Sequence, residues 1–397
     1  MKRILWMKLK FFSCLIALAI AGSACGSNSP ASESIPNPQV PPTSFPDIAV
    51  PAEINTPLIE SPALVKLDML DELNGWGVTE TQIARTNDGG VTWHNVTPPK
   101  IEETGSSVDT FVLDNDHAWV QKPDFDKYPN SGVLYRTTDG GITWTNASVP
   151  FSRGDLKFLD ASNGWVLADL GVGAGSNAVA VYQTTNGGNS WEQTYINDPN
   201  DTNAADSLPL GGLKSDLVPL NMKTAWVTGV TYAPGTVYLY RTDDGGHNWA
   251  QVPMTLPAGA ENFEVDIDRD QMKLVSVSDG YLALRMAGDS TQTAVYVTQD
   301  AGKTWAAPSM PLDGAGASVF LSAEEAIIYN GAQFYVTHDA AHTWVTISPN
   351  IDFGDSFASM EFINAQSGWV LTFDSTNNHR SLYRTTNGGA TWLPVLP

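Results

Sequence analysis

An eight-residue pattern recurs seven times between residues 86 and 392, and it limits the possible folds more than any other feature of the chain. Each copy starts with Thr, has Asp or Asn at its third position and ends with Trp. The terminal Trp residues follow one another at steps of 51, 47, 58, 56, 39 and 48 residues. A period of this length indicates a repeat architecture in which each copy belongs to one supersecondary unit.

Further strand signals precede each of these octads. The first is an alternating or apolar run, as in residues 108–114 and 359–364. The second strand signal begins with a small residue followed by a large apolar one, as in Gly75-Trp76 and Gly368-Trp369. A third run, such as 132–136, leads into the octad itself. Four short strands per unit of roughly 40–50 residues are typical of a propeller blade. We therefore predict an all-β fold, a seven-bladed β-propeller of four-stranded antiparallel blades, over residues 63–397.

The octad resembles the Asp box, or BNR repeat, with the pattern Ser/Thr-x-Asp-x-Gly-x-Thr-Trp found in sialidases, sortilins and xyloglucanases. The whole arrangement is most similar to the photosystem II assembly and stability factor-like BNR propellers, and the resemblance covers roughly residues 63–397. It implies a rigid disc that presents loops to a partner. That family is thought to dock polypeptides through an arginine-rich patch, which this arginine-poor, acidic chain does not match, so a photosynthetic role is not implied.

The polar groups of the octad are expected to be structural. The carboxylate or amide at the third position can accept hydrogen bonds from backbone N–H groups of its own turn, and the terminal Trp can pack between neighbouring turns. The Gly at the fifth position is expected to adopt a positive φ. The sixth octad has Ala340 and Ala341 in place of Gly-Gly, so we expect its turn to be the least regular. The residues assigned to this structural role are Asp88, Asp139, Asn186, Asp244, Asp300, Asp339, Asn387, Trp93, Trp144, Trp191, Trp249, Trp305, Trp344 and Trp392.

The N-terminal segment is interpreted as an export signal. Residues 1–24 combine four basic residues with an apolar run and a small-residue end, as a secretory signal peptide does. Cys25 then resembles the lipidated Cys of a bacterial lipobox, although Gly22 stands where that motif usually has Leu, and a plain signal peptide cleaved near Ala24 remains the alternative. Residues 25–62 form a Pro- and Ser-rich spacer. We expect an exported protein, anchored to the cell membrane as a lipoprotein.

The charge of the chain restricts its partners. The 397 residues carry a formal net charge of −22, and loss of residues 1–24 would change this to −26, with 17 basic against 43 acidic residues. A surface this negative repels phosphate backbones, so nucleic-acid binding is excluded. The remaining expectation is a monomer that binds an envelope protein, a peptide or a glycan.

An enzymatic role is the alternative function. The arginine triad of a sialidase has no counterpart, because Arg85, Arg136, Arg241 and Arg384 are repeat elements. The resemblance to xyloglucanases implies two propellers with one catalytic Asp each, and this chain has room for one. A glycoside hydrolase that uses two carboxylates at the propeller mouth stays open, and no catalytic residue can be assigned. No cofactor is expected; calcium is considered for residues 266–270 and 197–203, but Gln271 and Val277 break the first pattern.

Variable segments point to the recognition face. In a four-stranded blade, the turns between strands two and three lie on the same edge as the links between blades, opposite the octads. The longer segments on this edge are 122–131, 169–177, 197–215, 229–235, 257–270, 287–292 and 374–380. Segment 197–215 is expected to tolerate replacement by a short Gly-Ser turn. Loops on a rigid scaffold commonly carry recognition, and these loops offer Asp124, Phe125, Asp126, Tyr128, Asp198, Asp201, Tyr232 and Asp374 for a basic peptide, a glycan or a cation.

Overall fold

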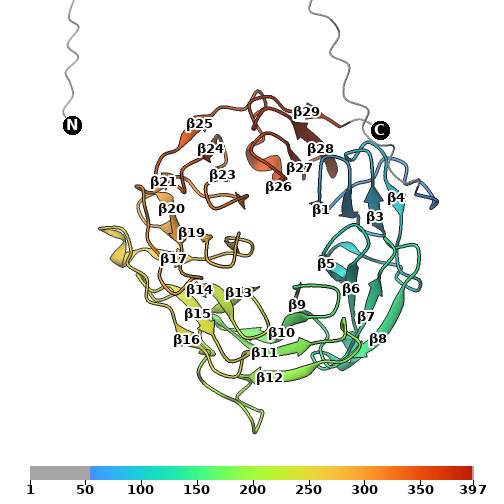
Figure 1. Cartoon of the computed structure of the whole chain (residues 1–397), viewed down its shortest axis with the longest axis horizontal. Coiled ribbons are helices and arrows are strands. Elements are labelled where there is room, and N and C mark those ends of the chain that lie inside the picture. The colour runs from blue at the N-terminus through green and yellow to red at the C-terminus, as the bar shows by residue number, and fades with distance from the viewer. Residues whose placement is uncertain (1–53, 396–397) are drawn as a thin grey trace, which may run out of the picture. The chain divides into compact units, whose positions relative to one another are not determined.

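The computed structural model describes residues 54–395, so the predicted signal peptide, Cys25 and most of the predicted spacer lie outside the described residues. Figure 1 shows that the described strands form a ring of small sheets around an open centre. The strands are antiparallel to their sheet neighbours, and the helical segments of residues 54–395 are four short 3₁₀ turns. This arrangement confirms the predicted all-β propeller fold. No helix in the described part of the chain has the length and apolar character needed to cross a membrane.

The strands fall into seven consecutive units, one for each octad. The first three units comprise β1 (Lys66–Met69), β2 (Gly75–Val78), β3 (Ile83–Thr86) and β4 (His94–Asn95); β5 (Asp109–Val112), β6 (Ala118–Pro123), β7 (Gly132–Thr137) and β8 (Thr145–Val149); and β9 (Gly154–Phe158), β10 (Gly164–Gly173), β11 (Ser176–Thr184) and β12 (Glu192–Ile196). Each of these units is a separate four-stranded sheet.

The fourth and fifth units share one nine-stranded sheet. They comprise β13 (Leu213–Pro219), β14 (Ala225–Thr231), β15 (Tyr238–Thr242) and β16 (Ala250–Gln251), followed by β17 (Glu264–Asp266), β18 (Met272–Leu274), β19 (Gly280–Ala287), β20 (Thr291–Thr298) and β21 (Leu312–Asp313). The link between the two units is itself a strand, because β17 pairs with both β14 and β19. This pairing fuses two blades along the edge that carries the links.

The last two units are again separate four-stranded sheets. They comprise β22 (Ser318–Phe320), β23 (Ala326–Tyr329), β24 (Phe334–Thr337) and β25 (Val345–Ile347), and β26 (Phe357–Phe362), β27 (Gly368–Asp374), β28 (His379–Thr385) and β29 (Leu393–Pro394). The 3₁₀ turns are η1 (Gly105–Ser107), η2 (Phe125–Lys127), η3 (Ala260–Asn262) and η4 (Gly354–Ser356).

The core lies between neighbouring blades and is built mainly from the second strand of each unit. The large side chains that begin these strands are buried: Trp76, Trp119, Trp165, Trp226, Tyr281, Ile327 and Trp369. The Trp119 indole donates from Nε1 to Gly187 O of the next octad at 3.0 Å, and Arg136 lies over the Trp119 ring while donating to Ala161 O at 2.8 Å. Arg85 and Arg384 likewise contact the neighbouring blade, through Gly140 O and Glu72, whereas Arg241 pairs with Asp243 of its own octad.

The ring closes through side chains of the first and last units. Trp369 donates from Nε1 to Gly89 O at 3.1 Å and packs with Leu67 and Trp93 in one buried cluster. Ser367 donates to Glu72 across the same seam at 3.0 Å. Residues 56–59 also lie against the first unit, where Ile59 N donates to Trp93 O at 2.8 Å. These residues belong to the segment that the sequence analysis assigned to the spacer.

Candidate functional site

The seven octads have nearly the same hydrogen-bond pattern. In the second unit, Asp139 accepts hydrogen bonds from Thr137 Oγ1 at 2.8 Å and from Thr143 N at 2.9 Å, while Gly141 N donates to Thr137 Oγ1. Asn186 and Asn387 accept the corresponding bonds through their amide oxygens. Each octad Asp or Asn thus accepts a backbone N–H of its own turn, which leaves no free acid for chemistry at these positions.

The octads lie beside the turns between the first and second strands. Gly89 N donates to Leu73 O at 2.8 Å, and Gly140 N donates to Asp116 O at 3.0 Å, so the two kinds of turn share one edge. Trp93, Trp249, Trp305 and Trp392 are buried, whereas Trp144, Trp191 and Trp344 are half-buried. The predicted positive φ of the fifth Gly is confirmed, and the residue before it also has a positive φ.

The sixth octad corrects one expectation. Its turn is as regular as the others, since Asp339 accepts bonds from Thr337 Oγ1 and Thr343 N, and Ala341 N donates to Thr337 Oγ1 at 3.0 Å. Ala340 and Ala341 adopt φ values of 54° and 63° to keep this geometry. The hydrogen bonds of Thr337 and Asp339 therefore hold two alanines in a region that disfavours side chains.

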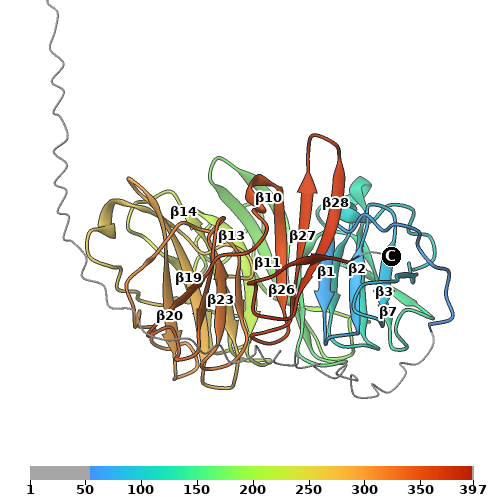
Figure 2. The same ribbon diagram turned by 90° about the horizontal axis from the view of Figure 1, so that it is seen from above.

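Two of the three predicted binding aromatics contact one hairpin, formed by β10 and β11, on the edge opposite the octads. Phe125 and Tyr128 follow β6, and Tyr232 follows β14. Figure 2 shows this hairpin projecting beyond the ring. Tyr128 donates from its hydroxyl to Asp169 Oδ2 at 3.2 Å, and the Tyr232 ring lies against Gly175 at the hairpin tip. The predicted loop 169–177 is in fact mostly strand, because β10 continues to Gly173 and β11 starts at Ser176.

The remaining predicted face residues are held locally. Asp124 pairs with Lys127 at 3.1 Å beside the exposed Asp126. The three others, Asp198, Asp201 and Asp374, accept backbone N–H groups of their own turns. Tyr128 and Tyr232 thus both contact the β10–β11 hairpin, whereas the predicted acids do not converge on one site.

Segment 197–215 is not the replaceable link that we expected. Leu208 is fully buried against Tyr195 and Trp249, and Asn197 accepts the Val179 N–H at 2.7 Å. Tyr195 Oη donates to the carbonyl oxygens of this segment, and Gly212 N donates to Gly175 O at 3.0 Å. The segment is part of the core and holds the tip of the β10–β11 hairpin.

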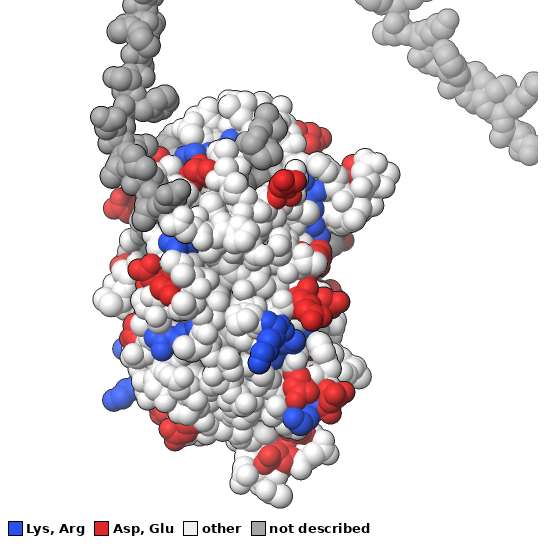
Figure 3. All heavy atoms as spheres, turned by 90° about the vertical axis from the view of Figure 1, so that its right-hand side faces the viewer, with Lys and Arg blue, Asp and Glu red and all other residues white. Residues whose placement is uncertain are grey.

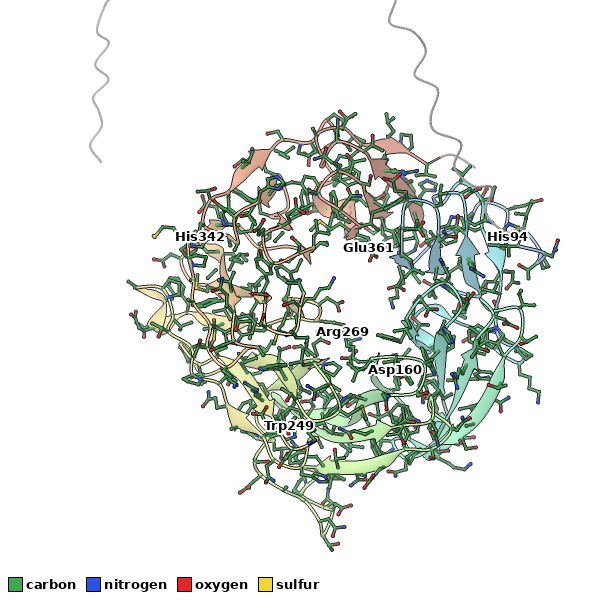
Figure 4. All side chains as sticks on the ribbon, in the orientation of Figure 1. His94, Asp160, Trp249, Arg269, His342 and Glu361 are labelled. Atoms are coloured by element: carbon green, nitrogen blue, oxygen red, sulfur yellow. The ribbon has the colours of Figure 1, made fainter. Side chains whose placement is uncertain are left out.

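The centre of the ring is a cavity of about 580 Å³. Its wall consists of the innermost strand of each unit, β1, β5, β9, β13, β18, β22 and β26, together with the segment before β18. Figure 4 shows Arg269 and Glu361 at opposite sides of this opening. Charged residues alternate with apolar ones along several of these strands, as in Asp155-Leu156-Lys157. That alternation is the sequence signal that could have identified the lining.

A charged network on one side of the cavity joins the third, fourth and fifth units. Lys157 Nζ lies 2.8 Å from Asp216 Oδ1, 3.5 Å from Asp155 Oδ1 and 3.7 Å from Asp270 Oδ1. Leu217 N donates to Asp155 Oδ2, and Asp270 N donates to Asp216 Oδ2. Arg269 Nη1 adds a longer contact of 3.8 Å to Asp155. Sequence reasoning missed this network because its members come from three separate segments of the chain, residues 155–157, 216 and 269–270.

The two buried carboxyl groups of this network differ in pKa. Burial, together with the adjacent negative charge of Asp155, raises the pKa of Asp216 to about 8. Burial also disfavours ionised Asp155, but Lys157 and Arg269 outweigh it and hold the pKa of Asp155 below its usual range. The pair is hydrogen-bonded and therefore carries one proton near neutral pH. Two carboxyls in direct contact are too close for the roughly 5–9.5 Å separation of a glycosidase pair.

A second cavity of about 340 Å³ opens at the edge that carries the β10–β11 hairpin and shares Asp155 and Arg269 with the central one. Arg153 donates to Asp109 at 3.0 Å in its wall. Lys214 Nζ donates to the carbonyl oxygens of Asn177, Leu210 and Gly212 at 3.0, 2.8 and 3.3 Å. Burial lowers the pKa of Lys214 to about 8. All three ammonium hydrogens are in use, so Lys214 is a structural cation rather than a nucleophile.

The residues considered for calcium do not converge. Asp266 pairs with Arg285, whereas Asp270 lies by Lys157. Among residues 54–395, no group of three or more His, Cys, Asp or Glu side chains could hold a metal ion. Figure 3 shows acidic and basic side chains scattered among uncharged ones on one outer side of the ring.

Comparisons with known proteins support the fold. No family model matches the chain. A 148-residue segment is 30% identical to xyloglucanase Xgh74A of Acetivibrio thermocellus, covering 32% of this chain and 17% of that enzyme. A 123-residue segment is 27% identical to the photosystem II assembly lipoprotein Ycf48 of a Synechococcus strain, covering 31% of this chain and 34% of that protein. The matched segments thus span about a third or less of these relatives.

Solved structures match over most of the ring. The structure of YCF48 bound to D1 peptide has a TM-score of 0.52 at 16% identity, covering 87% of this chain and 99% of that one. The GH74 xyloglucanase of Xanthomonas campestris has a TM-score of 0.55 at 14% identity, covering 85% of this chain and 55% of that one. The chain therefore shares the β-propeller fold of the resemblance stated above, a fold found both in a peptide-binding assembly factor and in polysaccharide-degrading enzymes.

Proposed function

We propose that the protein is a ligand-binding module of the cell envelope and that its ligand occupies the cavity at the hairpin edge of the ring. One observation carries the proposal: a cavity of about 340 Å³ lies beside a hairpin contacted by exposed aromatic side chains. This volume is within the range of roughly 300–1,000 Å³ typical of small-molecule sites. The YCF48 structure with its D1 peptide supports a binding role, since a propeller of similar fold holds a ligand.

The location of the protein is part of the same proposal. The basic head, apolar run and Cys25 support export and attachment to the membrane through an N-terminal lipid. The Synechococcus relative is named as a lipoprotein, which is consistent with this reading. The ring would then face the space outside the cytoplasmic membrane as a monomer.

Two exposed aliphatic residues on opposite edges allow a direct test. Val172 is 72% exposed at the hairpin tip, and Ile142 is 64% exposed within the second octad. We would place a photo-crosslinking amino acid at one position or the other in the full chain and irradiate cells of the source organism. Crosslinked envelope components are expected at position 172 and not at position 142. Equal yields, or crosslinks at position 142 alone, would show that the binding face is assigned to the wrong edge.

A glycoside hydrolase is the second candidate, and Glu361 favours it. Glu361 lies in the wall of the central cavity, where burial and the neighbouring Asp68 raise its pKa to about 8. A carboxyl group that stays protonated at neutral pH can serve as a general acid. The similarity to a xyloglucanase supports the same reading.

Release of reducing ends from a panel of neutral and acidic polysaccharides tests this candidate. Activity that is lost in Glu361→Gln and kept in Glu264→Gln, a change at an exposed glutamate of β17, would establish hydrolysis in the central cavity. No release from any polysaccharide by the wild-type protein would leave binding as the function.

A further inference from the structure

We propose that the cavity at the hairpin edge binds a neutral glycan chain. This inference rests on the proposed binding function and specifies its ligand. The charges lining the cavity balance, with Arg153, Lys214 and Arg269 against Asp109, Asp155 and Asp169. The chain as a whole carries a net charge of −22. A neutral pocket in so acidic a protein indicates an uncharged ligand.

The polar groups in the cavity are arranged as neighbouring donors and acceptors. The Arg153 guanidinium lies beside the Asp109 carboxylate at 3.0 Å, and Arg269 lies 3.8 Å from Asp155. Each pair offers a planar N–H donor next to a carboxylate acceptor. Adjacent hydroxyl groups of a sugar ring both donate and accept, so one such pair can satisfy two of them. A ligand carboxylate would instead meet Asp109 and Asp155, and a ligand ammonium would meet Arg153 and Arg269.

Apolar and aromatic side chains lie in the cavity wall and along the hairpin beside it. Tyr128 and Tyr232, which contact the hairpin, are 41% and 60% exposed, and Phe125 in the same loop as Tyr128 is 67% exposed. Val172 lies on the cavity wall itself. Exposed apolar side chains that form one patch commonly mark a binding site. The flat faces of the aromatic rings can pack against the C–H faces of sugar rings, while the tyrosine hydroxyls stay polar. Aromatics at two points along the hairpin suit a chain longer than one sugar.

The hairpin that forms the wall is fixed on both sides. Tyr128 donates to Asp169, midway along β10, while Gly175 at the tip accepts the Gly212 N–H. Lys214 bonds to the carbonyl oxygens of Asn177 and Gly212, so the hairpin and the following link share one cation. A wall held in place before the ligand arrives reduces the entropy lost on binding.

Glycan binding can be tested with the purified full chain. We would screen it on an array of neutral polysaccharides, polyuronates and synthetic peptides, then titrate the strongest neutral oligosaccharide by calorimetry. Arg269→Gln is expected to weaken binding about tenfold, the size of one charge-assisted hydrogen bond. The matched control is Arg285→Gln, which removes another Arg paired with an Asp outside the two cavities and should leave affinity unchanged. Val172→Glu, at an exposed position that the fold does not require, should also reduce binding.

The outcomes separate this inference from the proposed function. Binding of neutral oligosaccharides that weakens in both cavity variants supports the glycan site. Binding of peptides or polyuronates that is sensitive to the same variants overturns the neutral-glycan assignment and keeps the binding function. If the protein binds a ligand and neither Arg269→Gln nor Val172→Glu changes the affinity, both the neutral-glycan assignment and the proposed binding site are overturned.

Discussion

At the residue scale, the octad carboxylates show how a repeated turn can be mistaken for chemistry. The Thr343 side chain and backbone N–H donate to Asp339 and lower its pKa to about 2. The pKa of Asp300 is also about 2, because bonds from Thr304 outweigh the opposing effect of burial. Similar bonds hold the pKa values of Asp139 and Asp244 below their usual range. These groups are anions throughout the physiological range and are already saturated with donors.

A pH dependence of stability follows from these shifts. The folded-state pKa lies below the unfolded value of roughly 3.9, so the stabilisation is present above that value and is lost as pH falls towards 2. Thermal melts between pH 5 and pH 2.5 should therefore show a steep fall in Tm. Exchanging Asp139, Asp244, Asp300 and Asp339 for Asn should flatten that fall, since Asn keeps the acceptor, as in the third and seventh octads. The control exchanges Asp198 and Asp201 for Asn; an equal flattening there would contradict the assignment.

The sixth octad gives a second residue-scale prediction. Ala340 has a φ of 54°, a conformation that costs a side-chain-bearing residue roughly 1–2 kcal/mol. Glycine loses more backbone entropy on folding, so Ala340→Gly should raise the free energy of unfolding by at most about 1 kcal/mol. Gly140→Ala, at the equivalent position of the second octad, should lower it, because the new Cβ would meet the Arg85 guanidinium. Urea denaturation of both variants measures the two changes in the free energy of unfolding. Destabilisation by Ala340→Gly would show that the turn is unstrained.

At the element scale, the repeat units were predictable and the links between them were not. Thr, Asp and Trp at fixed spacing define the octad. Its hydrogen bonds join residues close in the chain, so the turn could be predicted from the sequence alone. Segment 197–215 has the composition of a loop because it is rich in Asn and Asp, but its Leu208 is fully buried and anchors the segment in the core. The Lys157 network could not be predicted from the sequence either, because Asp155, Asp216 and Asp270 come together only in the folded ring, from three neighbouring blades. Long-range convergence of this kind leaves no periodic trace in one sequence.

The link provides the element-scale prediction. Leu208→Ala should lower the free energy of unfolding by about 2–5 kcal/mol, as expected for a fully buried leucine. Leu210→Ala, two residues away and 37% exposed, is the matched control and should have a much smaller effect. Chemical denaturation monitored by tryptophan fluorescence compares them. Similarly small changes in the free energy of unfolding for both variants would indicate that segment 197–215 is a dispensable link.

At the scale of the whole molecule, the ring depends on one seam between chain ends. Each sheet of the first and last units is formed by consecutive strands, so side chains rather than a shared strand join them. Trp369→Ala should cost about 3–5 kcal/mol and should increase hydrogen exchange in β1 and β26 together. Trp119→Ala, an equally buried indole between the second and third units, should increase exchange locally. Unchanged exchange in β1 for Trp369→Ala would show that the seam is held by other contacts.

Membrane attachment of the whole molecule depends on a single thiol in our proposal. Two acyl chains on Cys25 would anchor the protein stably, since each buried methylene contributes roughly 0.8 kcal/mol. We expect the wild-type protein to enter the detergent phase in a detergent–water partition and Cys25→Ser to remain in the aqueous phase. Cys14→Ser is the matched control: it removes the only other cysteine, which lies within the predicted signal peptide, and should still partition into detergent. Wild-type protein in the aqueous phase with an unmodified N-terminus would refute lipidation and favour the plain signal peptide, leaving an acidic propeller free to diffuse to its ligand.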